Sequence, residues 1–168
     1  PDCPNFFEMT DNKFTVVTFD GSWDWVFRSI ESYSKYVFEN HMPKDVWNYF
    51  DSGFWIVNKS HKPFAKKLTD FYHSNSELLI EMQNKFLTGT EQTPLNMLLD
   101  IENIEMTHLP YEFNMNDMAR KEVLDDDLTF TKVGWVYQFN CIPNNKENAL
   151  TEYWMKKAYN HFYGEYKE

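Results

Sequence analysis

The chain has 168 residues, of which 42% are hydrophobic and 18% aromatic, so it can bury a core of the size found in one domain. Its 26 acidic residues outnumber 16 Lys and Arg residues, which gives a formal net charge of -10. This negative charge argues against binding a nucleic-acid polymer or an anionic membrane surface, because both need cations on the protein. It leaves open one small anionic ligand held by a few local cations or by a metal.

The cysteine count and the apolar runs limit the setting of the protein. Cys3 and Cys141 are too few for a disulfide framework and lack metal-site spacing, although one bridge between them stays open. Because thiols stay reduced inside cells, we expect a cytoplasmic protein. No apolar run has the length of a membrane span. The sequence begins Pro1-Asp2-Cys3-Pro4, which reads like the middle of a loop, so we expect a piece of a longer protein.

The first predicted elements are a strand and a helix. Residues 14–19 are rich in β-branched and aromatic side chains and predict a strand, which the turn pair Asp20-Gly21 ends. Ser22 is a plausible N-cap for a helix over about 23–40, where apolar residues recur at helical spacing.

A second strand and a long helix follow. The apolar run over 53–58 predicts the strand. Ser60 is the expected cap of a helix that begins near His61, and the helix-poor residues 73–76 predict a break within it.

Four further elements are predicted after a turn at Gly89. They are a helix that Thr93 caps and Pro94 begins, a short alternating strand over 104–109, a strand over 133–139, and an amphipathic helix over about 147–163. Residues 117–130 are charged and look exposed. Strands alternate with helices, so the expected fold class is α/β.

A small polar corner, Asp51-Ser52-Gly53, precedes the strand predicted over 53–58. Glycine lets a ligand approach the backbone closely, and the following residues favour a strand buried on both faces. Such a corner is a good place to hold a polar ligand. The alternative is a core strand entered by a tight turn.

The strongest candidate for chemistry is the run from Gly89 to Asn96, which places Glu91 and Gln92 at the start of a helix. Free N–H groups and the helix dipole favour anionic or hydroxyl-bearing ligands there. A carboxylate beside an amide suits sugar hydroxyls, and Glu91 could also serve as a base or an electrostatic stabiliser. The alternative is that Glu91 only complements the helix dipole while Gln92 faces solvent.

Other catalytic patterns are weak in this sequence. The five histidines show no paired spacing, which argues against a histidine metal site. The five glycines are isolated, so no glycine-rich phosphate loop is present.

The two polar corners, in this order and with a long helix between them, resemble the C-terminal half of GT-A-fold nucleotide-sugar glycosyltransferases. That family shows Asn/Asp-Ala/Ser-Gly on a strand and, farther along, Asp/Glu-Gln-x-x-Leu-Asn at a helix start. The segment from Pro1 to Phe7 resembles the stretch just after the family's Asp-x-Asp metal motif. The resemblance reaches to about residue 140. It implies the C-terminal portion of a Rossmann-like mixed-sheet fold with flanking helices.

The resemblance also implies roles for individual residues. Glu91 and Gln92 would be catalytic and would contact sugar hydroxyls, with Glu91 near the reacting centre. The residues implied to bind the donor sugar or the acceptor are Asp51, Ser52, Gly53, Asn96, Gln138 and Asn140.

The chain departs from the family pattern in two places. Many relatives bind metal and diphosphate with His-x-x-Gly-x-x-Lys, whereas Gln138, Cys141 and Asn144 stand at those offsets here. The nucleotide-binding βαβ region and the Asp-x-Asp motif are absent. The resemblance therefore implies a divalent cation, Mn²⁺ or Mg²⁺, held mainly by residues missing from this chain, which contributes no metal ligand of its own.

The implied partners are a nucleotide sugar, a carbohydrate or other hydroxyl acceptor, and an N-terminal half that lies upstream or in another chain. Without that half, we expect the chain to be inactive. A second function stays open, a non-catalytic carbohydrate-binding or assembly module. Its many Trp and Tyr residues would then form sugar-stacking or subunit surfaces.

Overall fold

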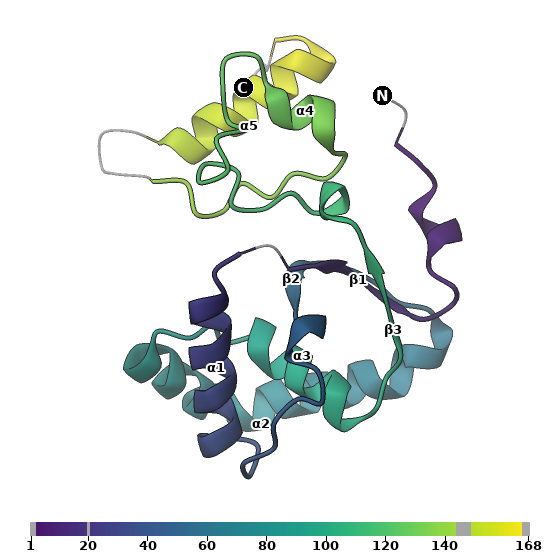
Figure 1. Ribbon diagram of the computed structural model, residues 1–168, viewed down its shortest axis with the longest axis vertical. Coiled ribbons are helices and arrows are strands. Elements are labelled where there is room, and N and C mark those ends of the chain that lie inside the picture. Colours follow the sequence, from purple (N-terminus) through teal and green to yellow (C-terminus); the bar gives the residue numbers. More distant parts are fainter. Residues whose placement is uncertain (1–2, 20, 144–148, 166–168) are drawn as a thin grey trace. The chain divides into compact units, whose positions relative to one another are not determined.

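A computed structural model describes residues 3–19, 21–143 and 149–165 of the chain (Figure 1). The chain forms two compact units, one spanning Asn5–Leu109 and the other combining Pro1–Pro4 with Pro110–Glu168. Each unit has its own cluster of buried hydrophobic residues.

The first unit contains a three-stranded sheet in the order β2-β1-β3. The strands are β1 (Phe14–Thr18), β2 (Phe50–Ile56) and β3 (Met106–Leu109). β1 lies antiparallel to β2 and parallel to β3, with Val16 opposite His108. The predicted strands at 14–19 and 104–109 are therefore confirmed in slightly shorter form, and so is the α/β class.

The segment Asp51-Ser52-Gly53 lies inside β2 and not in a turn before it, which corrects the alternative of a tight turn there. β2 begins at Phe50, three residues earlier than predicted, so Asp51-Ser52-Gly53 are extended strand residues. The expectation of a strand buried on both faces is also wrong, because Trp55 is 40% exposed. From Ser52 to Ile56 the residues of β2 alternate between half-buried and exposed, so one face of this part of the strand is open to solvent.

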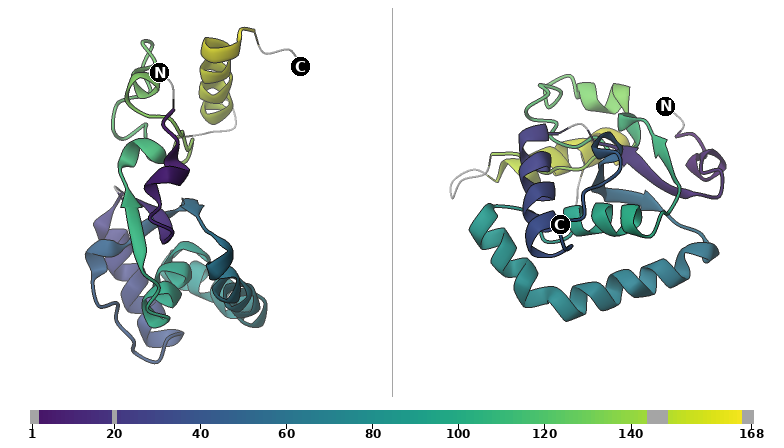
Figure 2. Two further views of the ribbon diagram at one scale, coloured as in Figure 1. Left: turned by 90° about the vertical axis from the view of Figure 1, so that its right-hand side faces the viewer. Right: turned by 60° about the horizontal axis from the view of Figure 1, so that its bottom comes forward.

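Three helices pack with this sheet, α1 (Trp23–Tyr36), α2 (Lys62–Phe86) and α3 (Gln92–Ile101). α3 contacts both α1 and β2, and α1 also contacts α2. Figure 2 shows the length of α2 beside the two shorter helices. All three helices were predicted, although α1 ends four residues earlier than expected.

The predicted break in α2 is wrong, since the helix runs unbroken through residues 73–76. Most of these polar residues face solvent, and Asn75 Nδ2 donates to the Phe71 carbonyl oxygen at 2.8 Å. The side-chain cap also differs from the prediction, because it stands before the short 3₁₀ turn that precedes α2 and not at the start of α2 itself. The capping residue is Asn58, not Ser60: its Oδ1 accepts from the backbone N–H of Ser60 at 2.9 Å. The short 3₁₀ turn Lys59–His61 then leads into α2.

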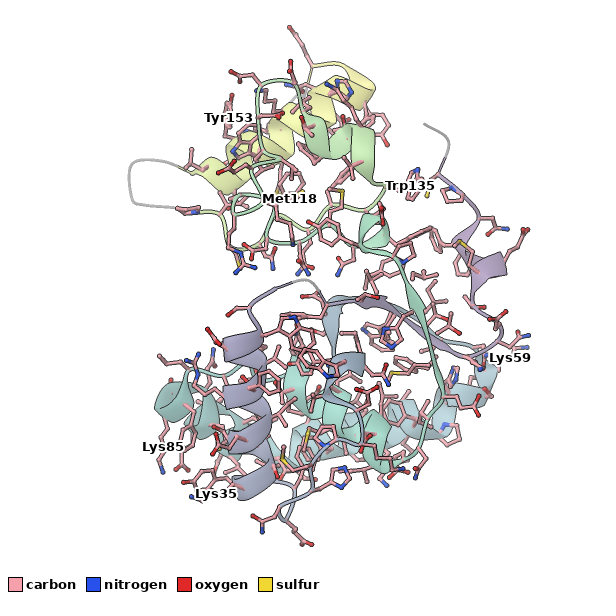
Figure 3. All side chains as sticks on the ribbon, in the orientation of Figure 1. Lys35, Lys59, Lys85, Met118, Trp135 and Tyr153 are labelled. Carbon is pink, nitrogen blue, oxygen red and sulfur yellow. The ribbon has the colours of Figure 1, made fainter. Side chains whose placement is uncertain are left out.

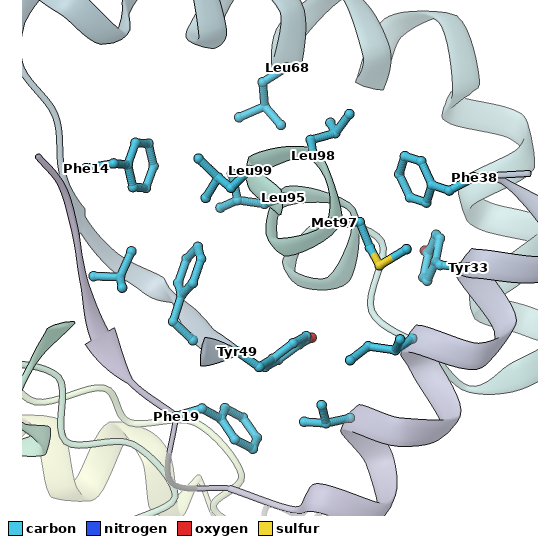
Figure 4. Packing of buried hydrophobic residues seen from close by; sticks show 14 of the residues in the cluster. Phe14, Phe19, Tyr33, Phe38, Tyr49, Leu68, Leu95, Met97, Leu98 and Leu99 are labelled. Carbon is cyan, nitrogen blue, oxygen red and sulfur yellow. The ribbon is translucent and has the colours of Figure 1, made fainter. Parts of the chain in front are cut away.

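The core of the first unit surrounds α3, in which every residue from Thr93 to Leu99 is buried. Figure 4 shows Met97 of α3 beside Tyr33 of α1, with the leucines of the same helix facing other core side chains. Such all-round burial means that polar side chains on α3 must find partners inside the protein.

The second unit has a smaller core, which includes Met118, Phe130 and Ala158. Its helices are α4 (Thr129–Val133) and α5 (Leu150–Tyr163), with a 3₁₀ turn at Tyr111–Phe113. The predicted last helix is confirmed over Leu150–Tyr163, with Ala149 as its N-cap; positions 147 and 148 lie outside the described residues.

Two predictions for the second unit are wrong. Residues 133–139 do not form a strand, because α4 extends to Val133 and Tyr137 makes only an isolated bridge with Met115. The segment 117–130 is not simply exposed, since Met118 and Phe130 are fully buried. Figure 3 shows the side chains of this unit, with Met118 labelled.

None of the helices in the described part of the chain is both long enough and apolar enough to span a membrane.

Candidate functional site

The two polar segments that the sequence analysis singled out, residues 51–53 and residues 89–96, are in direct contact. Ser52 Oγ on β2 donates to Glu91 Oε1 at 3.0 Å, across 39 residues of sequence. Ser52 N also donates to Gln92 Oε1 at 3.3 Å. Because Glu91 is exposed and Ser52 half-buried, these groups form a polar corner that solvent reaches. We call Ser52, Glu91 and Gln92 the polar corner from here on.

Asn96 fixes the position of α3 against β2. Its Oδ1 accepts from Phe50 N at 3.0 Å, and its Nδ2 donates to Phe50 O at 3.0 Å. The same Nδ2 donates to Gln92 O at 2.9 Å. Asn96 is 9% exposed, so its amide pairs with backbone groups in place of solvent. Its observed role is therefore to hold the polar corner together, whereas the resemblance implied contact with substrate.

Aromatic side chains hold the connector over residues 87–91, which leads from α2 into α3. The indole Nε1 of Trp25 donates to Leu87 O at 3.1 Å. The hydroxyl of Tyr33 donates to Gly89 O, and that of Tyr72 to Glu91 O, each at 2.7 Å. Three backbone carbonyls thus receive donors from α1 and α2, and the backbone that carries Glu91 is fixed.

These anchoring residues were missed as functional residues in the sequence. Tyr33 and Tyr72 occupy apolar positions of helical stripes, so their periodicity predicts burial alone. A buried Tyr hydroxyl requires a hydrogen-bond partner, and this is the signal that could have drawn attention to them.

The start of α3 differs in detail from the prediction. Its N-cap is Glu91, not Thr93, and Glu91 makes no side-chain capping bond. Thr93 is fully buried, and its Oγ1 lies 2.8 Å from the Tyr49 hydroxyl. Because the side chain of Glu91 turns to Ser52, Glu91 does not merely complement the helix dipole.

Two tyrosines beside the corner remain protonated phenols at neutral pH. Burial raises the pKa of Tyr49 well above its ordinary value, while hydrogen bonds to Thr93 and Gln92 act in the opposite direction. Burial also raises the pKa of Tyr72, and the charge of Glu91 adds to the effect. These hydroxyls therefore serve as hydrogen-bonding groups in their neutral form near pH 7.

Asp51 and Gly53, which flank Ser52 on β2, differ in their exposure to solvent. Asp51 is buried at 6% exposure, and its Oδ1 accepts from Gly53 N at 2.8 Å. Gly53 is exposed and adds no side chain beside Ser52. A ligand therefore has more access to Ser52 and Gly53 than to Asp51.

Gln138 and Asn140 belong to the second unit, and each has a local role there. Asn140 Oδ1 accepts from Asp117 N at 2.9 Å. Gln138 N donates to Met115 O at 2.8 Å, and Gln138 Oε1 is buried and has no hydrogen-bond partner among the described residues. Asn144, at the third offset of the metal and diphosphate motif, lies outside the described residues.

A metal centre does not assemble within the described ranges. No group of three or more His, Cys, Asp or Glu side chains there could hold a metal ion.

The polar corner offers a carboxylate, a hydroxyl and an amide on a backbone that neighbouring side chains hold in place. Only Oε1 of the Glu91 carboxylate bonds to Ser52, and Oε2 makes no hydrogen bond with the described residues. A hydroxyl-bearing ligand could therefore donate to Oε2 while the corner keeps its internal contacts.

The sequence matches no protein-family model, no curated protein and no solved structure.

Proposed function

We propose that the chain is the acceptor-side and catalytic part of a GT-A-type glycosyltransferase, which moves a sugar from a nucleotide-diphosphate sugar to a hydroxyl. The observation that carries the proposal is the 3.0 Å bond between Ser52 and Glu91, which unites two distant polar corners at an accessible edge. The order and spacing of these two motifs in the sequence support the same proposal.

In the proposed reaction, the bond between the anomeric carbon and the diphosphate oxygen breaks, and its electron pair leaves with the nucleoside diphosphate. The acceptor oxygen forms a new bond to the anomeric carbon and loses its proton. Glu91 has two available roles: Oε2 takes this proton, or the carboxylate stabilises positive charge on the sugar. Ser52 holds the carboxylate through its hydroxyl, Gln92 accepts from the backbone N–H of Ser52, and Gly53 leaves room for the ligand.

The test is a transfer assay on the full-length protein with Mn²⁺ and a panel of nucleotide sugars. We expect Glu91→Gln to lower kcat by at least about 100-fold, because general-base contributions are of that order. The matched control is Glu77→Gln, which changes an exposed glutamate on α2 and should leave kcat unchanged. Full activity in Glu91→Gln would remove Glu91 from the mechanism.

A non-catalytic carbohydrate-binding or assembly module is the second candidate, and exposed aromatic residues favour it. Trp47 is 65% exposed, and its ring centroid lies 4.8 Å from that of Trp23 and 6.0 Å from that of Phe27. Exposed Trp rings can stack on sugar faces. Saturable sugar binding without nucleotide or metal, lost in Trp47→Ala, would favour this candidate, whereas dependence on both would favour transfer.

A further inference from the structure

A cavity of about 490 Å³ lies in the second unit, where α5 and the segment 134–139 form most of its wall. This volume is within the range of sites that bind small molecules. Six of its ten described lining residues are aromatic, against 18% of the whole chain, so aromatic rings are concentrated here. The six are Trp135, Tyr137, Phe139, Tyr159, Phe162 and Tyr163.

Solvent reaches the rings on both walls of the cavity. Tyr159, Phe162 and Tyr163 are spaced by three and four residues, so they share one face of α5. Their side chains are 45%, 44% and 77% exposed, respectively. The rings of the segment 134–139 are half-buried. A ligand can therefore contact both sets of rings without opening the core of the unit.

The rings do not form one flat stack. The planes of Tyr137 and Phe162 are nearly parallel, at 8°, with centroids 6.3 Å apart. The plane of Tyr163 is inclined by 55° to that of Phe162 and by 45° to that of Tyr159. Ring faces thus have several directions, which suits a rounded group better than a flat one.

The lining offers few hydrogen bonds to a ligand. None of its described residues is Asp, Glu, Asn, Gln, Lys or Arg. The hydroxyl of Tyr137 already donates to Gly134 O at 2.8 Å. A sugar or a primary amine brings O–H or N–H donors, which lose free energy when they leave water and find no acceptor. Ligands of these kinds are therefore poorly matched to this cavity.

Electrostatics favour a ligand with positive charge. The face of an aromatic ring carries the negative part of its quadrupole and attracts a cation that lies within about 6 Å of the ring centroid. The chain has a formal net charge of -10, which also attracts cations. Both lysines of α5 already have acidic partners, since Lys156 pairs with Glu152 at 2.9 Å and Lys157 with Asp126 at 2.8 Å.

We propose that this cavity binds a small molecule with a trimethylammonium group, of which choline is the simplest probe, through cation–π contacts with its aromatic rings. A trimethylammonium group is rounded and positively charged, and it has no N–H group that would need an acceptor from the lining. The site is independent of the proposed sugar transfer, because none of its residues belongs to the polar corner.

The test is a titration of the protein at pH 7.5 with choline and with 3,3-dimethyl-1-butanol, the neutral isostere in which carbon replaces the ammonium nitrogen. Calorimetry measures the affinities, and proton NMR follows the ligand methyl signal, which nearby ring faces shift upfield. We expect saturable binding of choline with an upfield shift, and binding of the isostere at least about ten-fold weaker.

Phosphocholine distinguishes a phosphate-bearing headgroup from choline itself as the source of the trimethylammonium group. Because the described lining has no Lys or Arg to hold the phosphate, and the chain is acidic, we expect phosphocholine to bind more weakly than choline. Tighter binding of phosphocholine would overturn the assignment of the cavity to a small cation.

Two variants examine the proposed ring contacts. Phe162→Leu keeps an apolar side chain and removes the ring, so the affinity for choline should fall at least about five-fold, whereas that for the isostere should change less. Tyr153→Leu is the matched control, because it removes an exposed ring of the same helix that lies outside the lining, and it should leave both affinities unchanged.

Three results would overturn the proposal in this titration series: no saturable binding of choline, equal affinities for choline and the isostere, or an unaltered choline affinity in Phe162→Leu. Because the titrations contain no nucleotide sugar, their outcome is separate from the outcome of the transfer assay.

Discussion

Removing the Asn96 side chain should separate β2 from α3 and cause a large loss of stability. In Asn96→Ala, the buried backbone N–H and C=O of Phe50 lose partners at 3.0 Å each. A buried polar group left without a partner costs about 1–3 kcal/mol, so the pair predicts a loss of about 2–6 kcal/mol in the free energy of unfolding. Urea unfolding followed by tryptophan fluorescence measures this loss.

The control for Asn96→Ala is Asn84→Ala, which removes an exposed amide on α2 and should change stability by less than about 0.5 kcal/mol. Asn96→Asp gives a second comparison, because it keeps the shape but places a carboxylate oxygen against two carbonyl oxygens. We expect it to be destabilising at pH 7 and less so in acid, where protonation restores a donor. A loss below about 1 kcal/mol in Asn96→Ala, with the same slope of unfolding free energy against urea concentration as the wild type, would refute the inference that Asn96 fixes α3 against β2.

Three further predictions concern single groups. Gly134→Ala should lower stability by about 1–3 kcal/mol, because its Cβ would lie 2.7 Å from the Glu112 carbonyl oxygen; an unchanged Tm would contradict this. Tyr33→Phe should cost about 1 kcal/mol in urea unfolding by removing the donor to Gly89 O, and a neutral effect would show that water replaces the hydroxyl. Burial lowers the pKa of His61 below its ordinary 6.5, so the unfolded chain binds the proton first as pH falls. Stability should therefore decrease below pH 6.5, by up to about 1.4 kcal/mol per pH unit, and His61→Gln should reduce this dependence in urea unfolding between pH 7.5 and 5.5.

Local sequence patterns predicted most of the helices and the central strand. β1 could be recognised because β-branched and aromatic residues fill it, and four of its five residues are buried. The errors arose where tertiary contacts outweigh local preference. Residues 73–76 favour a break by composition, but the long α2 stays helical because its apolar stripe is packed on both sides of them, at Leu68 and Leu79.

The candidate site was harder to predict than the fold. The run of residues around Ser52 suggests a turn, yet it lies within β2, between the Phe50–Thr18 and Trp55–Val16 pairs, where the register with β1 shifts. No local rule joins Ser52 to Glu91 across 39 residues, and only the resemblance placed the two corners together.

The way in which the connector over residues 87–91 is anchored has a consequence for how this region could diversify. Trp25, Tyr33 and Tyr72 all bond to main-chain oxygens, which every amino acid possesses. Substitutions along the connector can therefore alter the chemistry presented to a ligand without changing the path of the chain. Descendants of this protein could acquire new ligand preferences by exchanging Thr90 or Glu91, provided that the three distant aromatic donors are retained.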